Sequence, residues 1–402
     1  MFLRHCELHN YRSWEHLALD LEPGITLFVG ANGQGKTNFV EGINYLSCLR
    51  SHRVSHDSPL IREGYDSATI TGTAVHRGRE LTVAIEINKG KTNQATINTA
   101  SCKTRDLLGV VATTLFAPED LNLVRGEPAM RRNYLDDLLV QRRPRLAAVL
   151  SDYDKVLRQR NALLKSANMA LRHGYRTEAG ASALTTLDAW DAQLAHHGAT
   201  IVAHRLRLLH ELSPYVAHNY HSLAPQSRSA TLHYESIAEL SVVNCGDTTP
   251  PDEEFIEAAL LAGLAAKRDK EIDRGMTLAG PHRDDLNLML GVHPAKGFAS
   301  QGETWSYALS LRLAAYDLMK EDGTEPILLL DDVFSELDKY RREALATVVS
   351  HAEQTLITAA VGDDLPNKLH PVATHTVTAT GDVNYRISTL DGATTHSEGD
   401  DG

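Results

Sequence analysis

Three parts of the chain differ in the pattern of their hydrophobic and polar positions. Between residues 67 and 98, apolar and polar residues alternate in the segments ATITGTAV, ELTVAIEIN and QATINTA. The polar segments HRGR and NKGK lie between them. A period of two predicts half-buried strands, and short polar turns join antiparallel neighbours. We therefore expect an antiparallel β-meander here, preceded by short strands in residues 1–29.

Helical periodicity dominates residues 120–275. Apolar residues recur at a spacing of three or four at Leu146, Leu150, Tyr153, Leu157 and Leu164, and again at Leu187, Trp190, Leu194, Ile201 and Leu208. This spacing predicts two long amphipathic helices that pack against each other. A helix of about 25 residues spans about 40 Å. We therefore expect a compact helical lobe rather than a long coiled-coil arm.

Alternating strands and helices return after residue 276. LNLML (286–290), PILLLDD (326–332) and QTLITAA (354–360) are predicted strands, and PILLLDD is apolar enough to be buried on both faces. Helices are predicted after Gln301 and in KYRREALATVVS. We expect an α/β fold in which residues 1–119 and 276–388 form one discontinuous domain around a mixed sheet. Residues 120–275 form an inserted, mainly helical domain, and the polar end, 389–402, forms a disordered tail.

The composition narrows the class of protein. The chain has 402 residues, 42% of them hydrophobic, and no apolar run of 18 residues, so we expect no membrane span. The N-terminal residues lack the pattern of a signal peptide. Four cysteines without CxxC spacing, Cys6, Cys48, Cys102 and Cys245, indicate reduced thiols of a cytoplasmic protein and argue against a structural zinc site. A net charge of −12 means that any contact with DNA needs a local basic surface.

Residues 30–37 match the phosphate-loop pattern GxxxxGK[ST] in full, with an apolar strand before them and a helix after. The predicted ATP-binding residues are Gly30, Ala31, Asn32, Gly33, Gln34, Gly35, Lys36 and Thr37. Glycines let backbone N–H groups wrap the phosphates, the lysine reaches the β- and γ-phosphates, and the threonine hydroxyl ligates Mg²⁺. A chance glycine-rich turn is the alternative interpretation.

The apolar strand PILLLDD ends in two acids, Asp331 and Asp332. In a phosphate-loop fold, the first acid at the end of such a strand holds Mg²⁺. The second then orients or deprotonates the attacking water, so Lys36 and Asp332 are the predicted catalytic residues. Two helix-capping aspartates are the structural alternative.

A second candidate anion-binding helix start lies in Ser300-Gln301-Gly302-Glu303. Its place between the phosphate loop and the acidic strand resembles ATP-binding-cassette (ABC) heads. In those heads this segment caps the γ-phosphate bound by a partner, so that a symmetric dimer completes two sites. This resemblance implies an ATP-dependent homodimer, with Asp338 at its interface. The simpler interpretation is an ordinary helix cap.

The finer resemblance is to the RecF family of bacterial recombination-repair ATPases. It rests on LHNYRSWEHLALDLEPGITLFVGANGQGKTN, LFAPEDLNLVRGEPAMRRNYLD, AGPHRDDL, FASQGE and LLLDDVFSELD, which follow in order along nearly the whole chain. The resemblance implies an ABC-type ATPase head with a second domain and a weak, DNA-stimulated ATPase that uses ATP and Mg²⁺. It also implies that the protein works with RecO and RecR to load recombinase at gapped DNA, in replication restart and in SOS induction.

The resemblance extends to single residues and also has departures. It places Asn38 beside the phosphate loop and Arg12 at the nucleotide. A histidine that senses the γ-phosphate usually stands at the end of the strand QTLITAA, and here no histidine follows at once. The usual glutamate after the metal-binding aspartate is the shorter Asp332. Both departures predict slow turnover, as in a switch rather than a motor.

DNA contacts are the least determined feature. Local basic clusters supply the candidate contact residues Arg50, Arg53, Arg131, Arg132, Arg142 and Arg143. Such clusters are more often solvated helix faces. The sequence shows no base-reading motif and no stacking motif. We therefore expect salt-dependent binding to the backbone of duplex or junction DNA, and binding to single-stranded DNA is an open alternative.

Three other classes of protein remain as alternatives. A transporter nucleotide-binding subunit is disfavoured by the long helical insertion. An SMC-type ATPase is disfavoured because the insertion is too short for its arm. An ATP-gated scaffold, in which hydrolysis is incidental, overlaps with the favoured interpretation.

Overall fold

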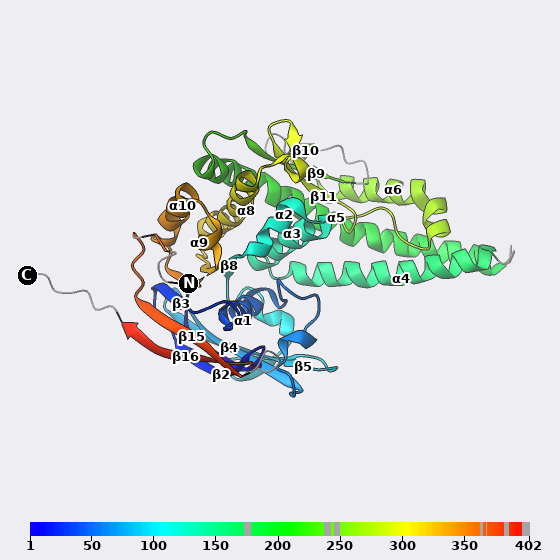
Figure 1. Cartoon of the computed structure of the whole chain (residues 1–402). Helices are drawn as coiled ribbons and strands as arrows, with labels where there is room; N and C mark the ends of the chain where they lie inside the picture. Colours follow the sequence, from blue (N-terminus) through cyan, green and yellow to red (C-terminus); the bar gives the residue numbers. More distant parts are fainter. Residues whose placement is uncertain are drawn as a thin grey trace, which may run out of the picture. The chain divides into compact units, whose positions relative to one another are not determined.

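The computed structural model describes residues 1–172, 178–236, 243–244, 250–361, 365–366, 368–381 and 386–395 (Figure 1). The chain divides into two compact units. The first, the head unit, comprises Met1–Asn122, Asn219–Ser227 and Ser300–Gly402. The second, the helical unit, comprises Leu123–His218 and Arg228–Ala299.

An antiparallel sheet forms one layer of the head unit. Its strands are β1 (Phe2–Tyr11), β2 (Trp14–Asp20), β4 (Ser67–His76), β5 (Arg79–Asn88), β6 (Gln94–Ile97) and β7 (Ala100–Cys102), in the order β2-β1-β4-β5-β6-β7. Every neighbouring pair is antiparallel. The predicted meander is therefore confirmed.

A mixed sheet forms the second layer. Its strands are β3 (Gly24–Val29), β8 (Thr113–Phe116), β13 (Ile327–Asp331), β14 (Gln354–Ala359), β15 (Ala373–Gly381) and β16 (Arg386–Thr395), in the order β16-β15-β3-β14-β13-β8. All its pairs are parallel except β15–β16. The central strands β13 and β14 are buried throughout, as parallel strands covered on both faces require.

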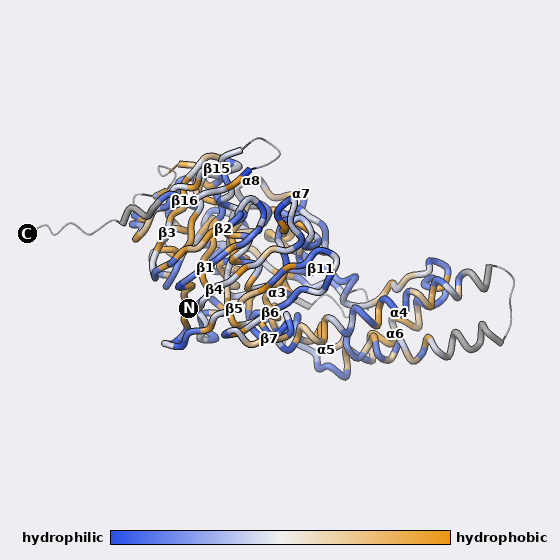
Figure 2. Tube along the Cα trace, turned by 90° about the horizontal axis from the view of Figure 1, so that it is seen from below, coloured by the Kyte–Doolittle hydropathy of each residue, from blue (hydrophilic) through white to orange (hydrophobic). Residues whose placement is uncertain are grey.

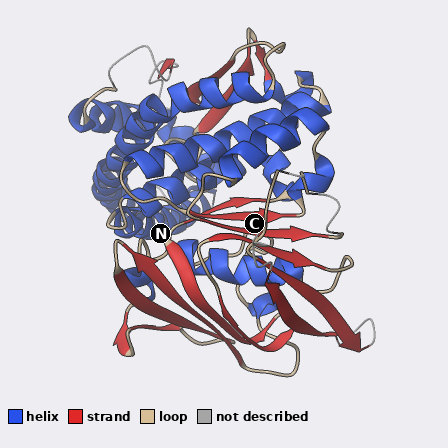
Figure 3. Cartoon of the chain, turned by 90° about the vertical axis from the view of Figure 1, so that its left-hand side faces the viewer, coloured by secondary structure: helices blue, strands red, loops and turns tan. Residues whose placement is uncertain are grey.

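Helices cover both faces of the mixed sheet. Helix α1 (Lys36–Cys48) lies between the two sheets (Figure 3), where Ile43 packs with Leu8 and Leu329. The opposite face carries α8 (Gln301–Glu321), α9 (Val333–Glu336) and α10 (Lys339–Val349), through Leu309 and Leu345. Short segments η1 (Ser58–Leu60), η2 (Thr104–Leu107), η3 (Pro118–Asp120) and α2 (Leu121–Arg125) complete the connections. This layered α/β arrangement confirms the predicted fold class.

The helical unit is built on four helices: α3 (Pro128–Arg142), α4 (Leu146–Arg172), α5 (Glu178–Leu223) and α6 (Glu253–Arg274). Leu164, Leu187 and Ile272 bring α4, α5 and α6 into one apolar cluster. Apolar and hydrophilic positions alternate along α4 and α6 in Figure 2, as amphipathic helices require. Helix α5 has 46 residues. It is therefore about 69 Å long, well beyond the expected length.

The described boundaries differ from the predicted domains at two places. LNLML forms a strand, β11 (Asp285–Leu290), but it pairs with β9 (Ala230–Glu235). Because Leu286 and Leu288 bury their side chains within that sheet, residues 276–299 do not join the head as predicted. The sheet also includes β10 (Val243–Asn244) and β12 (His293–Pro294), and α7 (Ala295–Phe298) follows it.

The second difference lies at the C-terminus. Strand β16 pairs with β15 from Arg386 to Thr395, so the predicted tail, 389–402, began too early. Residues 396–402 lie outside the described residues.

Two expectations from composition concern cysteines and membranes. Cys6, Cys48 and Cys102 are free thiols, and Cys245 lies outside the described residues. Burial raises the pKa of Cys6 to about 12, so this thiol stays protonated and unreactive. Within the described part of the chain, none of the helices combines the length and the apolar character needed to cross a bilayer.

Candidate nucleotide-binding site

The predicted phosphate loop connects β3 to α1 in a tightly enclosed bend. Gly35, directly before the helix, has a φ of 107°, and a β-carbon there would lie 2.2 Å from Ser388 Oγ. A β-carbon on Gly30 would lie 2.2 Å from the carbonyl oxygen of Val377. Both positions therefore require glycine, because the loop passes between neighbouring strands too closely for any side chain.

Three side chains outside the motif hold the carbonyl groups of this loop. Trp14 Nε1 donates to the Gly35 carbonyl at 3.1 Å, and Ser388 Oγ donates to the Gln34 carbonyl at 2.6 Å. Arg386 donates to the Gly33 carbonyl at 3.0 Å. Since the carbonyl groups are bound from outside, the loop is fixed before a phosphate arrives. None of these three residues was predicted from the sequence.

The rest of the loop divides into bound and exposed residues. Asn38 Nδ2 donates to Ser13 Oγ at 2.8 Å, and Ser13 Oγ lies 2.7 Å from Ser388 Oγ, whose single proton goes to the Gln34 carbonyl. Ala31 and Asn32 are exposed. The amide oxygen of Gln34 is buried and has no hydrogen-bond partner among the described residues. The loop thus presents unpaired polar groups of the kind that a bound nucleotide would satisfy.

Asp331, at the end of β13, lies against the start of α1. Its Oδ1 accepts hydrogen bonds from Thr37 Oγ1 at 3.0 Å and from Thr358 Oγ1 at 2.7 Å. Burial raises the pKa of Asp331 to about 6; the two threonine hydrogen bonds oppose this shift, and the charges of Asp332 and Glu119 add to it. The positive charge of a divalent cation would stabilise the ionised carboxylate of Asp331, so Thr37 and Asp331 fit Mg²⁺.

Lys36 and Asp332 face each other across the same site. The Lys36 side chain is buried and its Nζ donates to the Gly30 carbonyl at 2.7 Å, while it lies 3.9 Å from Asp332 Oδ2. Asp332 has a φ of 51°, and its backbone N–H donates to Thr358 Oγ1 at 2.9 Å. Its Oδ1 is buried without a hydrogen-bond partner among the described residues. Asp332 thus keeps an unsatisfied carboxylate oxygen at the end of β13.

Arg12 and Arg53 converge on one buried carboxylate beside the loop. Arg12 forms a two-pronged ion pair with Glu41, at 2.8 and 2.9 Å, and also donates to the Pro59 carbonyl. Arg53 lies 3.7 Å from Glu41 and donates to Asn38 Oδ1 at 3.1 Å. Arg53 was predicted as a DNA contact, but these bonds attach it to the phosphate-loop helix. The contact of Arg12 with a nucleotide stays a prediction.

The second helix start is a complete capping box. Glu303 N donates to Ser300 Oγ at 3.2 Å, and Ser300 N donates to Glu303 Oε2 at 2.9 Å. Ser300 and Gln301 are exposed. The cap alone therefore explains Ser300 and Glu303, but not the glycine between them.

Gly302 lies beside an arginine that the sequence did not indicate. A β-carbon on Gly302 would approach Arg341 to 3.0 Å. Arg341 donates to Ser306 Oγ at 2.7 Å and forms an ion pair with Asp338, the residue that caps α10. The starts of α8 and α10 are thus joined, and Asp338 belongs to the same surface as Ser300 and Gly302.

The remaining basic candidates are mostly engaged within the helical unit. Arg131 is buried and forms a two-pronged ion pair with Asp285, at 2.8 Å on both prongs, which removes it from the candidate DNA contacts. Arg132 donates to the Asp284 carbonyl. Arg142 pairs with Glu211, and Arg143 lies 3.3 Å from His204 Nδ1. Arg50, at the end of α1, is partly exposed.

Residues 2–377 match the family described as the RecF/RecN/SMC N terminal domain. The chain is also 53% identical, over 384 residues, to the DNA replication and repair protein RecF of Rhodococcus erythropolis, and the match covers 92% of each chain. The chain belongs to the RecF family. The resemblance seen in its motifs is thereby confirmed.

Solved structures agree with this assignment. The ATP complex of the recombination mediator protein RecF in the RecFOR pathway has a TM-score of 0.83 and 25% identity, with 94% of this chain and 95% of that chain covered. The Smc head domain of Pyrococcus furiosus, bound to the C-terminal domain of ScpA, has a TM-score of 0.52 and 15% identity, over 97% and 96% of the two chains. The second likeness shows the shared head fold alone.

Proposed function

We propose that this protein is an ATP-dependent DNA-binding protein of recombinational repair and replication restart. ATP brings two chains together around DNA, and slow hydrolysis releases them. Together with RecO and RecR, the complex promotes recombinase loading at gaps and SOS induction, in the bacterial cytoplasm. The family membership and the RecFOR pathway named for the solved relative support this role.

One observation carries the ATP-dependent part of the proposal. Lys36, Thr37, Asp331 and Asp332 meet at one end of the mixed sheet, and Asp332 keeps a buried, unpartnered oxygen there. Thr37 and Asp331 would hold Mg²⁺, which supplies positive charge to the phosphates. The exposed Ala31 and Asn32 and the loop N–H groups would bind the phosphate chain.

Hydrolysis depends on Asp332. Its unpartnered oxygen is suited to orient the attacking water and to accept its proton. It is one methylene shorter than the glutamate usual in related heads, and Ala360 and Val361, not a histidine, directly follow β14. Both features favour slow, DNA-stimulated turnover, as a switch requires.

Dimerisation rests on the surface formed by Ser300, Gln301, Gly302 and Asp338. Ser300 and Gln301 are exposed at a helix N-terminus, where the backbone dipoles favour an anion. A partner's γ-phosphate is the proposed ligand of this exposed helix start. Duplex or junction DNA would then contact basic residues such as Arg50. Binding to single-stranded DNA is the alternative to test.

An ATP-gated scaffold, in the manner of SMC-type proteins, is the second candidate, because the Smc head shares the fold. In that case, ATP binding alone would suffice for function. Asp332→Asn separates the two, since a scaffold keeps its activity in cells when hydrolysis is blocked. A transporter subunit is less favoured, because the match to the RecF relative extends over the helical unit as well.

The primary test is solution mass by light scattering, with and without MgATP and duplex DNA. We expect wild-type mass to double with MgATP, and Lys36→Ala and Ser300→Arg to stay monomeric. Ser300→Arg should still bind ATP, because Ser300 lies outside its own site. If Ser300→Arg dimerises as the wild type does, or if nothing dimerises even on DNA, the two-chain mechanism is wrong.

A further inference from the structure

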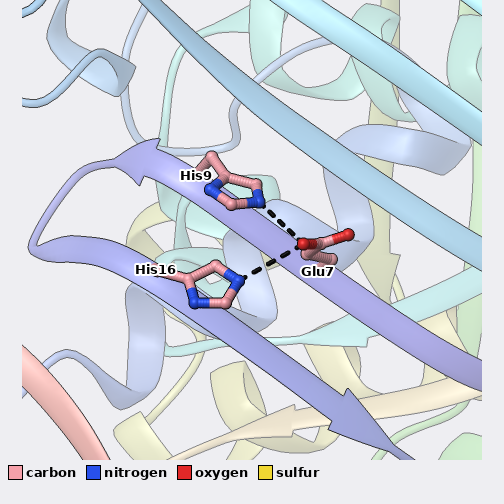
Figure 4. Close-up of side chains that lie close together, drawn as sticks. All are labelled: Glu7, His9 and His16. Carbon is pink, nitrogen blue, oxygen red and sulfur yellow. Dashed lines mark hydrogen bonds and ion pairs between the residues drawn. The ribbon is translucent and has the colours of Figure 1, made fainter.

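Three metal-binding side chains converge on the outer face of the hairpin formed by β1 and β2. Glu7 Oε1 lies 2.7 Å from His9 Nε2 and 3.3 Å from His16 Nε2 (Figure 4). The two imidazole rings are stacked, with centroids 4.4 Å apart and planes 24° apart. One ligand atom from each residue lies within 4.8 Å of the others.

The strand geometry explains why these residues meet. His9 and His16 are directly opposite each other in the antiparallel register, and Glu7 precedes His9 by two residues on the same face. Cys6 and Leu8, which alternate with Glu7 and His9, are fully buried on the other face. The cluster is therefore fixed by the backbone of one hairpin, entirely within the head unit.

We propose that Glu7, His9 and His16 form a binding site for a divalent transition-metal ion of the Zn²⁺ type. Two imidazoles and one carboxylate suit Zn²⁺, Ni²⁺ or Cu²⁺, whereas Mg²⁺ prefers oxygen ligands and octahedral geometry. With only three protein ligands, at least one position on the metal stays open to water. This site is separate from the Mg²⁺ position at Thr37 and Asp331.

The distances fit such an ion with only small adjustments. Metal bonds of about 2 Å in tetrahedral geometry put neighbouring ligand atoms about 3.3 Å apart. The two Glu7–histidine separations differ from this value by less than about 1 Å, which side-chain rotation can supply.

The side chains are also accessible. Glu7, His9 and His16 are 32%, 45% and 55% exposed, so an ion can enter from solvent without any opening of the sheet. A bound metal would tie β1 to β2 close to the turn that carries Ser13 and Trp14. Since both of these residues bond to the phosphate-loop region, the metal would stabilise the hairpin that supports the loop.

The chain contains 20 histidines, so variants must separate this site from scattered weak binding. The full chain, stripped of metals and kept in excess Mg²⁺ without nucleotide, is titrated with Zn²⁺ by calorimetry. His9→Gln and His16→Gln each remove one ligand. His5→Gln is the matched control, because His5 lies on the same hairpin face and pairs with Asp20, at 2.7 Å, outside the cluster.

We expect the wild type and His5→Gln to share one Zn²⁺ site that each ligand variant weakens by at least about tenfold, because loss even of an outer partner costs that much. Zn²⁺ should also slow hydrogen exchange of β1 and β2 amides in the wild type and the control only. Equal Zn²⁺ affinity in all four proteins would overturn the proposal, as would exchange rates that Zn²⁺ leaves unchanged. Matching circular dichroism without metal would show that the variants fold.

Discussion

Ser388 donates a hydrogen bond to the carbonyl oxygen of Gln34, a residue 354 positions earlier in the chain, at 2.6 Å. The side chain of Ser388 is buried, and the same hydroxyl also reaches Ser13 Oγ. The last described strand of the chain and the first hairpin therefore meet on the phosphate loop. This contact turns a flexible glycine-rich segment into a fixed one.

Ser388→Ala should weaken ATP binding without touching the motif. Removing the hydroxyl takes away the donor to the Gln34 carbonyl, while Ser13 keeps its bond from Asn38, at a cost of about 1–3 kcal/mol. We expect a several-fold rise in the ATP dissociation constant, measured with a fluorescent nucleotide. Thr389→Ala, at the exposed neighbouring position, should bind as the wild type does. Equal affinities for Ser388→Ala and Thr389→Ala would mean that the loop needs no support from β16.

The raised pKa of Asp331 predicts a pH dependence of stability. Its folded-state pKa of about 6 exceeds the ordinary value of 3.8, so the folded protein binds this proton more tightly than the unfolded one does. Stability therefore falls as pH rises from about 4 to about 6, by at most about 3 kcal/mol, and stays level above that. Asp331→Asn removes the titrating carboxyl group, so its stability should not fall over this pH range.

Hydrogen exchange of β13 without Mg²⁺ measures the effect. Between pH 5 and pH 7 the wild type should lose protection relative to Asp331→Asn. In the wild type, MgATP affinity should weaken as pH falls below about 6, because a protonated carboxyl group is a poor metal ligand. A constant difference in protection across this range would contradict the prediction.

Arg341 should matter for association and not for ATP binding by one chain. It joins Asp338 and Ser306 beside Gly302 on the proposed dimer surface. Arg341→Ala frees the start of α10, so we expect MgATP to raise its mass less than it does for the wild type in light scattering. ATP binding by the monomer should be unchanged. Lys339→Ala, exposed on the same helix, is the control, and an equal defect in both would remove Arg341 from this role.

Arg160 holds the helical unit together from inside. Its fully buried guanidinium pairs with Asp191 and Glu271, at 2.6 Å each, and donates to Thr277 at 2.8 Å. Arg160→Leu leaves Glu271 buried without the arginine that pairs with it and Asp191 with Arg268 as its remaining partner, which should destabilise the unit by about 3–5 kcal/mol.

The matched control is Arg158→Leu, because Arg158 is exposed on the same helix. For Arg158→Leu, we expect the hydrogen exchange of α4 and α6, measured during unfolding in urea, to match that of the wild type. If Arg160→Leu exchanges no faster than Arg158→Leu, the buried ion pairs contribute nothing net to stability.

Local motifs allowed much of the site to be predicted. Lys36 and Thr37 follow a strand and open a helix, and Asp331 ends an apolar strand, so neighbouring residues alone indicated where they lie. Ser388 and Trp14 escaped prediction because strand pairing, which no local pattern encodes, brings them to the loop. A serine in a polar C-terminal stretch gives no signal of its own.

The errors have the same origin. Arg131 seemed to belong to an exposed basic cluster because its partner, Asp285, lies 154 residues away. Strand β11 was predicted as a strand but assigned to the wrong sheet, since its alternation shows which side is buried and not which strand pairs with it. The Glu7, His9 and His16 cluster has no sequence signal, because His16 meets the other two through the pairing of β1 with β2.

The strand order of the mixed sheet has a consequence for biosynthesis. Strand β3 emerges from the ribosome among the first thirty residues, yet its neighbours β14 and β15 begin only at Gln354 and Ala373. The nascent chain must therefore carry the unpaired phosphate-loop strand through most of translation, while residues 123–299 are already available to fold. A product that terminates early, just before Arg386, would contain every nucleotide-binding motif and still lack the strand that fixes the loop.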